Sequence, residues 1–311
     1  MAMTFVDSLL NRTTRSIWIT WLIQSTDKAA IETLAFLSKC YSEVPHDRRS
    51  RLSKRLEAGD QQEVDAAITE LVIHELLKRL ELQPEWSPAI EGLTPDLKFQ
   101  VAGQEFIADV VRVKSPSKTV DKRSNIILSE DKPTEPSESR AKKIADRIAE
   151  KATKYSKLKL PFVAFVFRGD HYLSDVAKVE VALYGMTLDE IMLEAGFPTS
   201  LDHGHPYPGI LLPRDGQETP HRNLAAVVYC DWFDTLNRAD EGKRLHCIVL
   251  HNWAASTALP IEAFDSFGQI TWLKTDIGHW TPRIIGDRGI VSKFIDGNSM
   301  EMRIYSAATP W

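Results

Sequence analysis

The sequence has few cysteines and no long hydrophobic run. Its 311 residues include three cysteines, Cys40, Cys230 and Cys247, which are widely spaced and form no Cys-x-x-Cys pair. This usage argues against a disulfide framework and a zinc ribbon, and it favours a reducing cytoplasm as the location. The most apolar early stretch, residues 17–23, is far shorter than the ~20 residues of a membrane span, and no signal-peptide pattern precedes it. We therefore expect no membrane association.

The short motifs of several common enzyme classes are also missing. The chain contains no phosphate-binding loop, no Gly-x-Gly-x-x-Gly turn and no Gly-x-Ser-x-Gly elbow. Hydrophobic residues make up 43% and charged residues 26%, which is the composition of an ordinary globular protein. The length allows two domains, or one core with large additions.

The chain does not carry the positive net charge of a typical nucleic-acid binder, because its net charge is −5. The charges are unevenly distributed, however. Residues 1–169 carry 27 Lys and Arg against 24 Asp and Glu, whereas residues 170–311 carry 11 against 19. Between Lys98 and Lys159 there are 15 basic and 9 acidic residues. Phosphate backbones require a local positive potential, which this middle segment offers.

The N-terminal part of the chain reads as helical. Apolar residues recur at steps of three and four through residues 5–58, and a longer helix with one apolar face is predicted from Gln61 to Leu82. Pro84 and Pro88 follow this helix and end it.

After the prolines, the hydrophobic period changes from helical to alternating. Residues 96–101 and 105–113 are predicted to be two strands of a hairpin, followed by a proline-containing loop over residues 115–139. A basic helix is expected from Ser139 to about Ser156, with Ser139 as its cap. Residues 160–167 are continuously apolar, which is typical of a strand buried on both faces.

The C-terminal part is less regular. Residues 176–183 fit either a strand or the start of a short helix, residues 187–195 fit a helix, and residues 224–229 and 245–250 fit buried strands. The pattern predicts three regions: a helical N-terminal region (1–58), a core (59–170) and an acidic α+β extension (171–311).

Three acidic residues occupy informative places in the predicted core. Glu70 lies in the long helix, Asp96 follows Pro95 at the start of the first hairpin strand, and Asp109 lies in the middle of the second. In this order and context the chain resembles the PD-(D/E)XK nuclease superfamily. The matching segments are residues 68–77, 94–99, 103–110, 151–155 and 161–165.

The resemblance implies an α/β fold with a restriction-endonuclease-like mixed central sheet flanked by helices. It also implies a nuclease that hydrolyses nucleic-acid phosphodiesters, DNA rather than RNA, with Mg²⁺ as cofactor and Mn²⁺ as the alternative ion. Asp96 and Asp109 would bind the ion, assisted by Glu70, because Mg²⁺ prefers oxygen ligands and stabilises the charge that develops on the reacting oxygens. Glu75 competes with Glu70 as the helix carboxylate. The alternative for Asp96 is a turn-initiating residue, and that for Asp109 is a partly buried charge at a strand edge.

The chain departs from the family pattern at one position. The family lysine stands two residues after the strand acid, and this chain has Val111 there. Two residues could replace it. Lys114 follows in the same strand at odd spacing, and Lys151 lies on the basic helix, from which some members of the superfamily supply their lysine. We favour Lys151 as the catalytic lysine, and the third alternative is that no residue replaces it and catalysis is slow or lost.

The basic helix also predicts a contact with the nucleic-acid backbone. At 100° per residue, one stripe of the helix contains Arg140, Lys143, Arg147, Lys151 and Lys154, beside the apolar residues Ile144, Ile148 and Tyr155. A one-sided basic stripe next to two strand carboxylates suits a phosphate backbone. The alternative is that the stripe is a solvated face that keeps the protein in solution.

Two weaker alternatives complete the sequence-based expectations. His203 and His205, together with residues near His246, Cys247 and His251, have a spacing that could bind zinc, although loops with such residues arise freely. The chain could also be an inactive nuclease-like fold that binds nucleic acid or a protein without chemistry. In that case the acidic C-terminal half offers a surface for a second copy of the chain or for another subunit.

Overall fold

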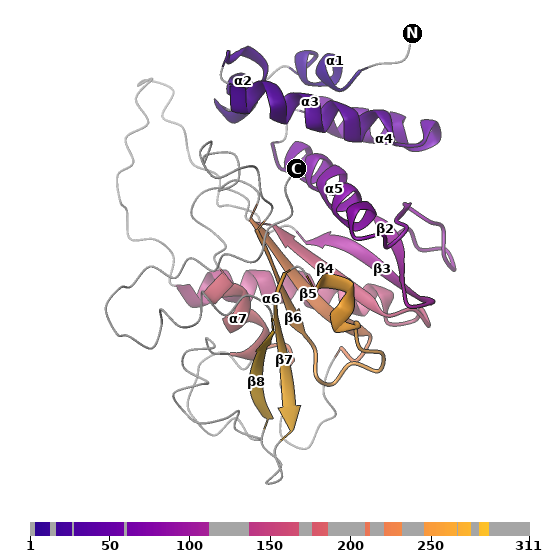
Figure 1. Cartoon of the computed structure of the whole chain (residues 1–311), viewed down its shortest axis with the longest axis vertical. Coiled ribbons are helices and arrows are strands. Elements are labelled where there is room, and N and C mark those ends of the chain that lie inside the picture. The colour runs from indigo at the N-terminus through magenta and orange to yellow at the C-terminus, as the bar shows by residue number, and fades with distance from the viewer. Residues whose placement is uncertain are drawn as a thin grey trace.

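The structure is a computed structural model, and it describes residues 4–12, 17–26, 28–58, 61–111, 137–167, 176–185, 209–211, 221–231, 246–265, 267–274 and 280–285. Five helices of the N-terminal part gather at one end, and a twisted sheet with two further helices against it lies at the other (Figure 1). The helices are α1 (Phe5–Leu10), α2 (Ile17–Gln24), α3 (Lys28–Ser42), α4 (His46–Glu57), α5 (Gln61–Arg79), α6 (Ser137–Tyr155), α7 (Val176–Tyr184) and the 3₁₀ helix η1 (Ile261–Phe264).

The strands follow in the same chain order. They are β1 (Glu85–Trp86), β2 (Leu97–Val101), β3 (Gln104–Val111), β4 (Phe162–Phe167), β5 (Leu224–Asp231), β6 (His246–His251), β7 (Gly268–Lys274) and β8 (Trp280–Ile285). In the described part of the chain they form one eight-stranded sheet, in which each strand pairs with the next. The sheet is mixed, because β3, β4 and β5 are parallel to one another and β6 is parallel to β7, while the other pairs are antiparallel.

The β2–β3 hairpin forms where the sequence predicts it. Its two-residue turn places Ala102 at φ 49° and Gly103 at φ 80°, a left-handed conformation that favours glycine at the second position and matches the twist of the flanking strands. The turn fixes the register, in which Leu97 lies opposite Ala108. Asp96 therefore reaches the level of Asp109 and Val110 from the neighbouring strand.

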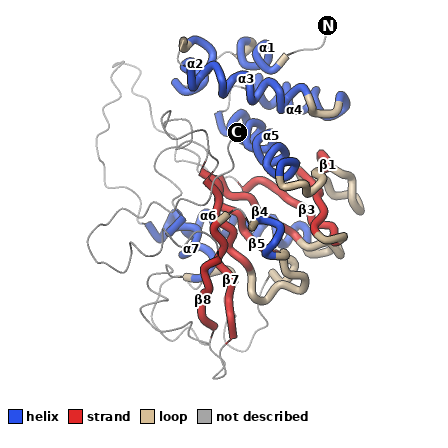
Figure 2. The backbone as a smooth tube through the Cα atoms, in the orientation of Figure 1, coloured by secondary structure: helices blue, strands red, loops and turns tan. Residues whose placement is uncertain are grey.

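Helices cover both faces of the sheet, as the sequence predicts for an α/β protein. One face packs against α5 through side chains that include Phe106, Ala108 and Val110 of β3, and these belong to a core that also contains Leu71 and Val72 of α5. The alternate residues of β3 face the other way, into a core that contains α6 and α7. The two layers of helix are visible on either side of the strands in Figure 2.

Both helices of the second layer connect parallel strands. α6 lies between β3 and β4 in the sequence, and α7 lies between β4 and β5. Neighbouring parallel strands require such crossovers, because the end of one strand and the start of the next lie at opposite ends of the sheet. The apolar residues Ala141, Ile144, Ile148 and Ala152 of α6 are completely buried or nearly so, which confirms the predicted apolar face of the basic helix.

Several predicted bounds change in the structure. The basic helix begins at Ser137 rather than after a cap at Ser139. Residues 176–184 form a helix, which is one of the two alternatives that the sequence leaves open. The helix predicted at residues 187–195 lies outside the described residues.

β5 pairs with β4, so strands from both sides of residue 170 belong to the same sheet. Within the described ranges, every helix is too short or too polar to cross a membrane.

His74 shows how α5 is packed against the start of the sheet. Its ring stacks on Trp86 of β1 with 4.4 Å between ring centroids. Burial, followed by the positive charge of Lys78, lowers the pKa of His74 to about 4. A histidine in an unfolded chain has a pKa of about 6.5. The folded protein therefore holds His74 neutral where the unfolded chain would bind a proton.

This difference predicts an acid-sensitive step in stability. The stability contributed by neutral His74 is complete above pH ~6.5 and is lost as the pH falls towards 4, by about 2 kcal/mol. We expect His74→Gln to lose correspondingly less stability than the wild type between pH 7 and pH 4.5. Urea unfolding at the two pH values measures the difference, and equal losses in both proteins would contradict the assignment.

Candidate metal centre

Asp109 is a carboxylate in the interior of the sheet. It lies in β3 opposite Ala164 of β4, and its side chain is only 1% exposed. Its neighbours on the same face, Ile107 and Val111, are buried beneath α6. An ionised carboxylate in such surroundings is unstable unless it is paired and hydrogen-bonded. The contacts of Asp109 therefore identify the chemistry that this part of the sheet supports.

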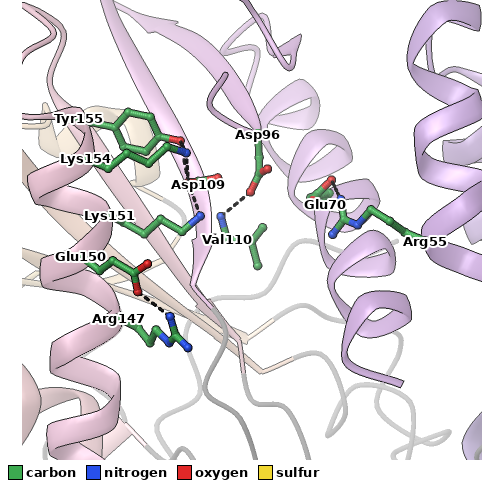
Figure 3. A network of polar contacts seen from close by, with 10 residues as sticks. All are labelled: Arg55, Glu70, Asp96, Asp109, Val110, Arg147, Glu150, Lys151, Lys154 and Tyr155. Carbon is green, nitrogen blue, oxygen red and sulfur yellow. Dashed lines mark hydrogen bonds and ion pairs between the residues drawn. The ribbon is translucent and has the colours of Figure 1, made fainter. Parts of the chain in front are cut away.

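Two side chains of α6 bind the same oxygen of Asp109. Lys151 Nζ donates a hydrogen bond to Oδ2 at 2.6 Å, and the Tyr155 hydroxyl donates to it at 2.8 Å. Lys151 and Tyr155 are one helical turn apart and thus share a face of α6. Burial, and then the charge of Asp109, raise the pKa of Tyr155, so its hydroxyl stays protonated as a donor. Figure 3 shows both side chains pointing from α6 towards β3.

Asp96 approaches Asp109 from the adjacent strand. Its Oδ2 accepts a hydrogen bond from the backbone N–H of Val110 at 2.9 Å, and its carboxyl is hydrogen-bonded to that of Asp109. Burial, followed by the negative charges of Glu70 and Asp109, raises the pKa of Asp96 well above its ordinary value. Burial alone would also raise the pKa of Asp109, but the hydrogen bond from Asp96 and the Lys151 ammonium outweigh it and lower this pKa. These opposite shifts favour a proton on Asp96 over one on Asp109.

Glu70 is engaged by an arginine. Arg55 Nη1 lies 2.7 Å from both Oε1 and Oε2 of Glu70, and Arg55 Nε lies 3.1 Å from Glu63. Glu70 is 4% exposed. Burial alone would lower the pKa of Arg55, but Glu70, Asp96 and Glu63 raise it, so the guanidinium stays charged. In Figure 3 the Glu70 carboxylate is turned towards Arg55 of α4.

The position of the missing family lysine is part of the core. Val111 is 1% exposed and belongs to the cluster that contains Ile144 and Ile148 of α6. Lys114 lies outside the described residues. Lys151, the favoured replacement, lies on the strand carboxylate, with its Nζ 2.6 Å from Asp109 Oδ2.

Of the remaining predicted residues, Lys154 borders this centre, whereas Lys143, Arg147 and Glu75 have other surroundings. Lys143 and Arg147 lie on the exposed side of α6, where Arg147 pairs with Glu150 at 2.6 Å. Lys154 Nζ donates to the Tyr155 hydroxyl at 2.8 Å and lies 4.0 Å from Asp109 Oδ2. Glu75, the competing helix carboxylate, pairs with Arg79 at 2.8 Å.

The donors present fit an ion that keeps most of its water ligands. Among the residues whose placement is described, no group of three or more His, Cys, Asp and Glu side chains could hold a metal. Asp96 and Asp109 provide two carboxyls that share a proton, and an ion could replace that proton. Mg²⁺ is commonly bound through one or two carboxylates and several waters, so this oxygen-only pair suits it better than it suits zinc.

The described residues of the weaker zinc hypothesis make other contacts. His251 Nε2 is hydrogen-bonded to Gln269 at 2.9 Å, and the Cys247 thiol lies against the Cys230 thiol at 2.9 Å. Both histidine and thiol are thus engaged within the sheet. His203 and His205 lie outside the described residues.

Two contacts at this centre are not predicted by the sequence. Arg55 belongs to a short polar helix, and its pairing with Glu70 depends on how α4 packs against α5. Tyr155 was assigned only to the apolar side of the basic helix. Its position four residues after Lys151, which puts both on one helix face, is the signal that could have identified it.

No model of a known protein family, no characterised protein and no solved structure matches this chain significantly. The geometry of the carboxylate pair and its α6 partners is therefore the basis for inferring function.

The shared proton predicts opposite effects of two similar substitutions in the absence of metal. Since the folded pKa of Asp96 is raised, its contribution to stability is present at low pH and is lost as the pH rises through that pKa. Asp96→Asn keeps a hydrogen-bond donor without the ionisation, so it should be more stable than the wild type at pH 9, by about 1 kcal/mol.

Asp109→Asn should instead be less stable by about 2–3 kcal/mol, because it leaves the Lys151 ammonium without its counter-charge. Urea unfolding of both variants in EDTA at pH 6 and pH 9 checks the pair. Equal destabilisation by the two substitutions would contradict the assignment of the proton to Asp96.

Proposed function

We propose that this protein hydrolyses nucleic-acid phosphodiesters with Mg²⁺, and that its substrate is DNA rather than RNA. The observation that carries the proposal is the 2.6 Å contact between Lys151 Nζ and Asp109, beside the Asp96 carboxyl. Two convergent carboxyls and an ammonium at one point are the groups that a metal-dependent nuclease requires. The resemblance of the ordered sequence segments to PD-(D/E)XK nucleases supports the same reaction and the choice of DNA.

Asp96 and Asp109 are the proposed metal ligands. A bound Mg²⁺ supplies a Lewis acid that stabilises charge on the attacking and leaving oxygens. Asp96 must release its proton to serve as a ligand, while Asp109 is already ionised. The hydrogen bond from the Val110 N–H fixes one oxygen of Asp96, and the other remains for the ion.

Lys151 is the proposed catalytic lysine. Its ammonium is held at Asp109 and its side chain is 30% exposed, so it borders both the carboxylate pair and solvent. From this position it can orient a water molecule and offset the negative charge of a phosphate. Tyr155 positions the Asp109 carboxylate, because its buried hydroxyl donates a hydrogen bond to the oxygen that Lys151 also contacts.

The exposed side of α6 is the proposed contact for the nucleic-acid backbone. Lys143, Arg147 and Lys154 lie along this helix, on the same element that brings Lys151 to the carboxylates. A phosphate bound there would be directed to the metal centre. Such contacts position a backbone without reading its sequence.

A second function, nucleic-acid binding without cleavage, has one observation in its favour. The position of the family lysine holds buried Val111, and Lys151 is already bound to Asp109 in an ion pair. An ammonium that remains in this pair would not stabilise a transition state. The two functions differ in chemistry but share the basic face of α6, so cleavage and binding have to be measured separately.

The nuclease proposal predicts which substitutions abolish cleavage. Asp96→Ala and Asp109→Ala should each remove Mg²⁺-dependent DNA cleavage, and Lys151→Met should lower its rate at least about 100-fold. Lys142→Met removes the same charge from an exposed position of α6 and should change the rate less than about twofold. A gel assay in Mg²⁺ and in Mn²⁺ measures the rates, and cleavage by the Asp96→Ala/Asp109→Ala double variant at the wild-type rate would exclude this centre.

The backbone contact predicts a change in salt dependence. Replacing Lys143, Arg147 and Lys154 with methionine should weaken DNA binding and reduce the slope of log affinity against log salt by about 2 to 3, because each lost phosphate contact lowers it by about 0.9. Fluorescence anisotropy in EDTA between 50 and 200 mM salt, a range in which such slopes are resolved, provides the measurement. An unchanged slope would assign the stripe to solvation.

A further inference from the structure

Glu70 is a third carboxylate near the proposed metal ligands, and it is held away from them by an ion pair. Both of its oxygens lie 2.7 Å from the same nitrogen, Nη1 of Arg55. Figure 3 shows the Glu70 side chain between Asp96 and Arg55, and its negative charge acts on the Asp96 carboxyl. Glu70 thus lies within electrostatic range of the metal centre, but both of its carboxylate oxygens are bound by Arg55.

Arg55 belongs to the N-terminal helical region rather than to the sheet. It comes from α4, which packs against α5, and its side chain is 15% exposed. Its Nε binds Glu63, while its buried Nη2 has no hydrogen-bond partner among the residues that the structure describes. The guanidinium is therefore fixed by two carboxylates of α5 and leaves one donor unsatisfied. That arrangement depends on attraction to Glu70 rather than on complete hydrogen bonding.

We propose that Arg55 is a positioning residue that withholds Glu70 from the metal. The N-terminal helical region thereby limits the centre to two carboxylates, Asp96 and Asp109, and keeps its affinity for a divalent cation low. Release of Arg55 from Glu70 gives the ion a third oxygen ligand. This inference rests on the proposed function, because it requires that Asp96 and Asp109 bind the ion.

The opposite role is the usual one for an arginine beside a ligating carboxylate, which is to orient it and to strengthen binding. The two roles predict opposite changes in metal affinity when Arg55 is removed. If Arg55 withholds Glu70, its removal tightens metal binding. If Arg55 orients a carboxylate that already ligates, its removal weakens binding. The contact of one nitrogen with both oxygens favours withholding, because an orienting donor would leave one oxygen for the ion.

The affinity of the full-length protein and its variants for Mn²⁺ distinguishes the two roles. Free Mn²⁺ is measured by electron paramagnetic resonance with wild type, Arg55→Met, Glu70→Gln and the double variant. Arg55→Met should bind Mn²⁺ about tenfold more tightly than the wild type. Glu70→Gln alone should weaken binding far less than Asp96→Asn does, because it removes a nearby negative charge but no ligand. The double variant should return to the wild-type value because the released ligand is absent.

Arg51→Met is the matched control, since it removes one positive charge from an exposed position of the same helix. It should leave the affinity unchanged, which separates release of Glu70 from a general change in charge. Arg55→Lys supplies a second variant if Arg55→Met does not fold. It keeps the charge but not the planar guanidinium, and its gain should lie between those of wild type and Arg55→Met.

The outcomes separate this inference from the proposed function. Wild-type binding that Asp96→Asn abolishes, with no gain in either Arg55 variant, overturns the role of Arg55 alone. A loss of binding in Glu70→Gln as large as that in Asp96→Asn shows that Glu70 already ligates, and it overturns the inference as well. Absence of Mn²⁺ binding in the wild type and in both Arg55 variants overturns the metal centre together with the inference.

Discussion

The Asp109 side chain, 1% exposed in the middle of β3, requires compensation from every element that surrounds it. Lys151 and Tyr155 of α6 provide a charge and a hydroxyl on one side, and the neighbouring strand provides Asp96 with its proton. These contacts fix the rotation of α6 about its axis at the level where the hairpin turn aligns Asp96 with Asp109. An Asp109 replaced by an apolar residue would leave Lys151 and Tyr155 without the partner that now orients them. The same contacts therefore determine how α6 packs on the sheet and which polar groups meet at the site.

Much of this arrangement could be predicted because it is local in sequence. The hairpin follows from alternating residues around a Gly-containing turn, and the apolar face of α6 follows from its period, which also placed Lys151 beside the sheet. Arg55 could not be predicted, since its partner Glu70 is 15 residues away and lies on a different helix. A polar helix carries several basic residues, and only the packing of α4 against α5 selects the one that meets a buried carboxylate.

The C-terminal half shows a second limit of sequence reasoning. Its strands were predicted as buried from continuous apolar runs, but such runs contain no information about which strand lies next to which. In the structure, β5 pairs with β4 in parallel, and β6, β7 and β8 extend the same sheet. β4 is therefore an interior strand with a neighbour on each side. The strand that carries Asp109 is consequently held in a wider sheet than a core ending at residue 170 would provide.

The buried Val111 and the helix-borne lysine are connected by the same packing. A lysine two residues after Asp109 would project onto the face that α6 covers, where Val111 now contacts a cluster containing Ile144 and Ile148. An ammonium there would lose its hydration beneath an apolar helix face. Lys151 instead approaches from the side of α6, so its charge reaches Asp109 while its stem stays partly exposed. The valine is thus a condition for packing α6 over β3, and its presence is compatible with a lysine at the carboxylate pair. What distinguishes cleavage from binding is whether Lys151 can exchange Asp109 for a phosphate, and its 30% exposure leaves a path for that exchange.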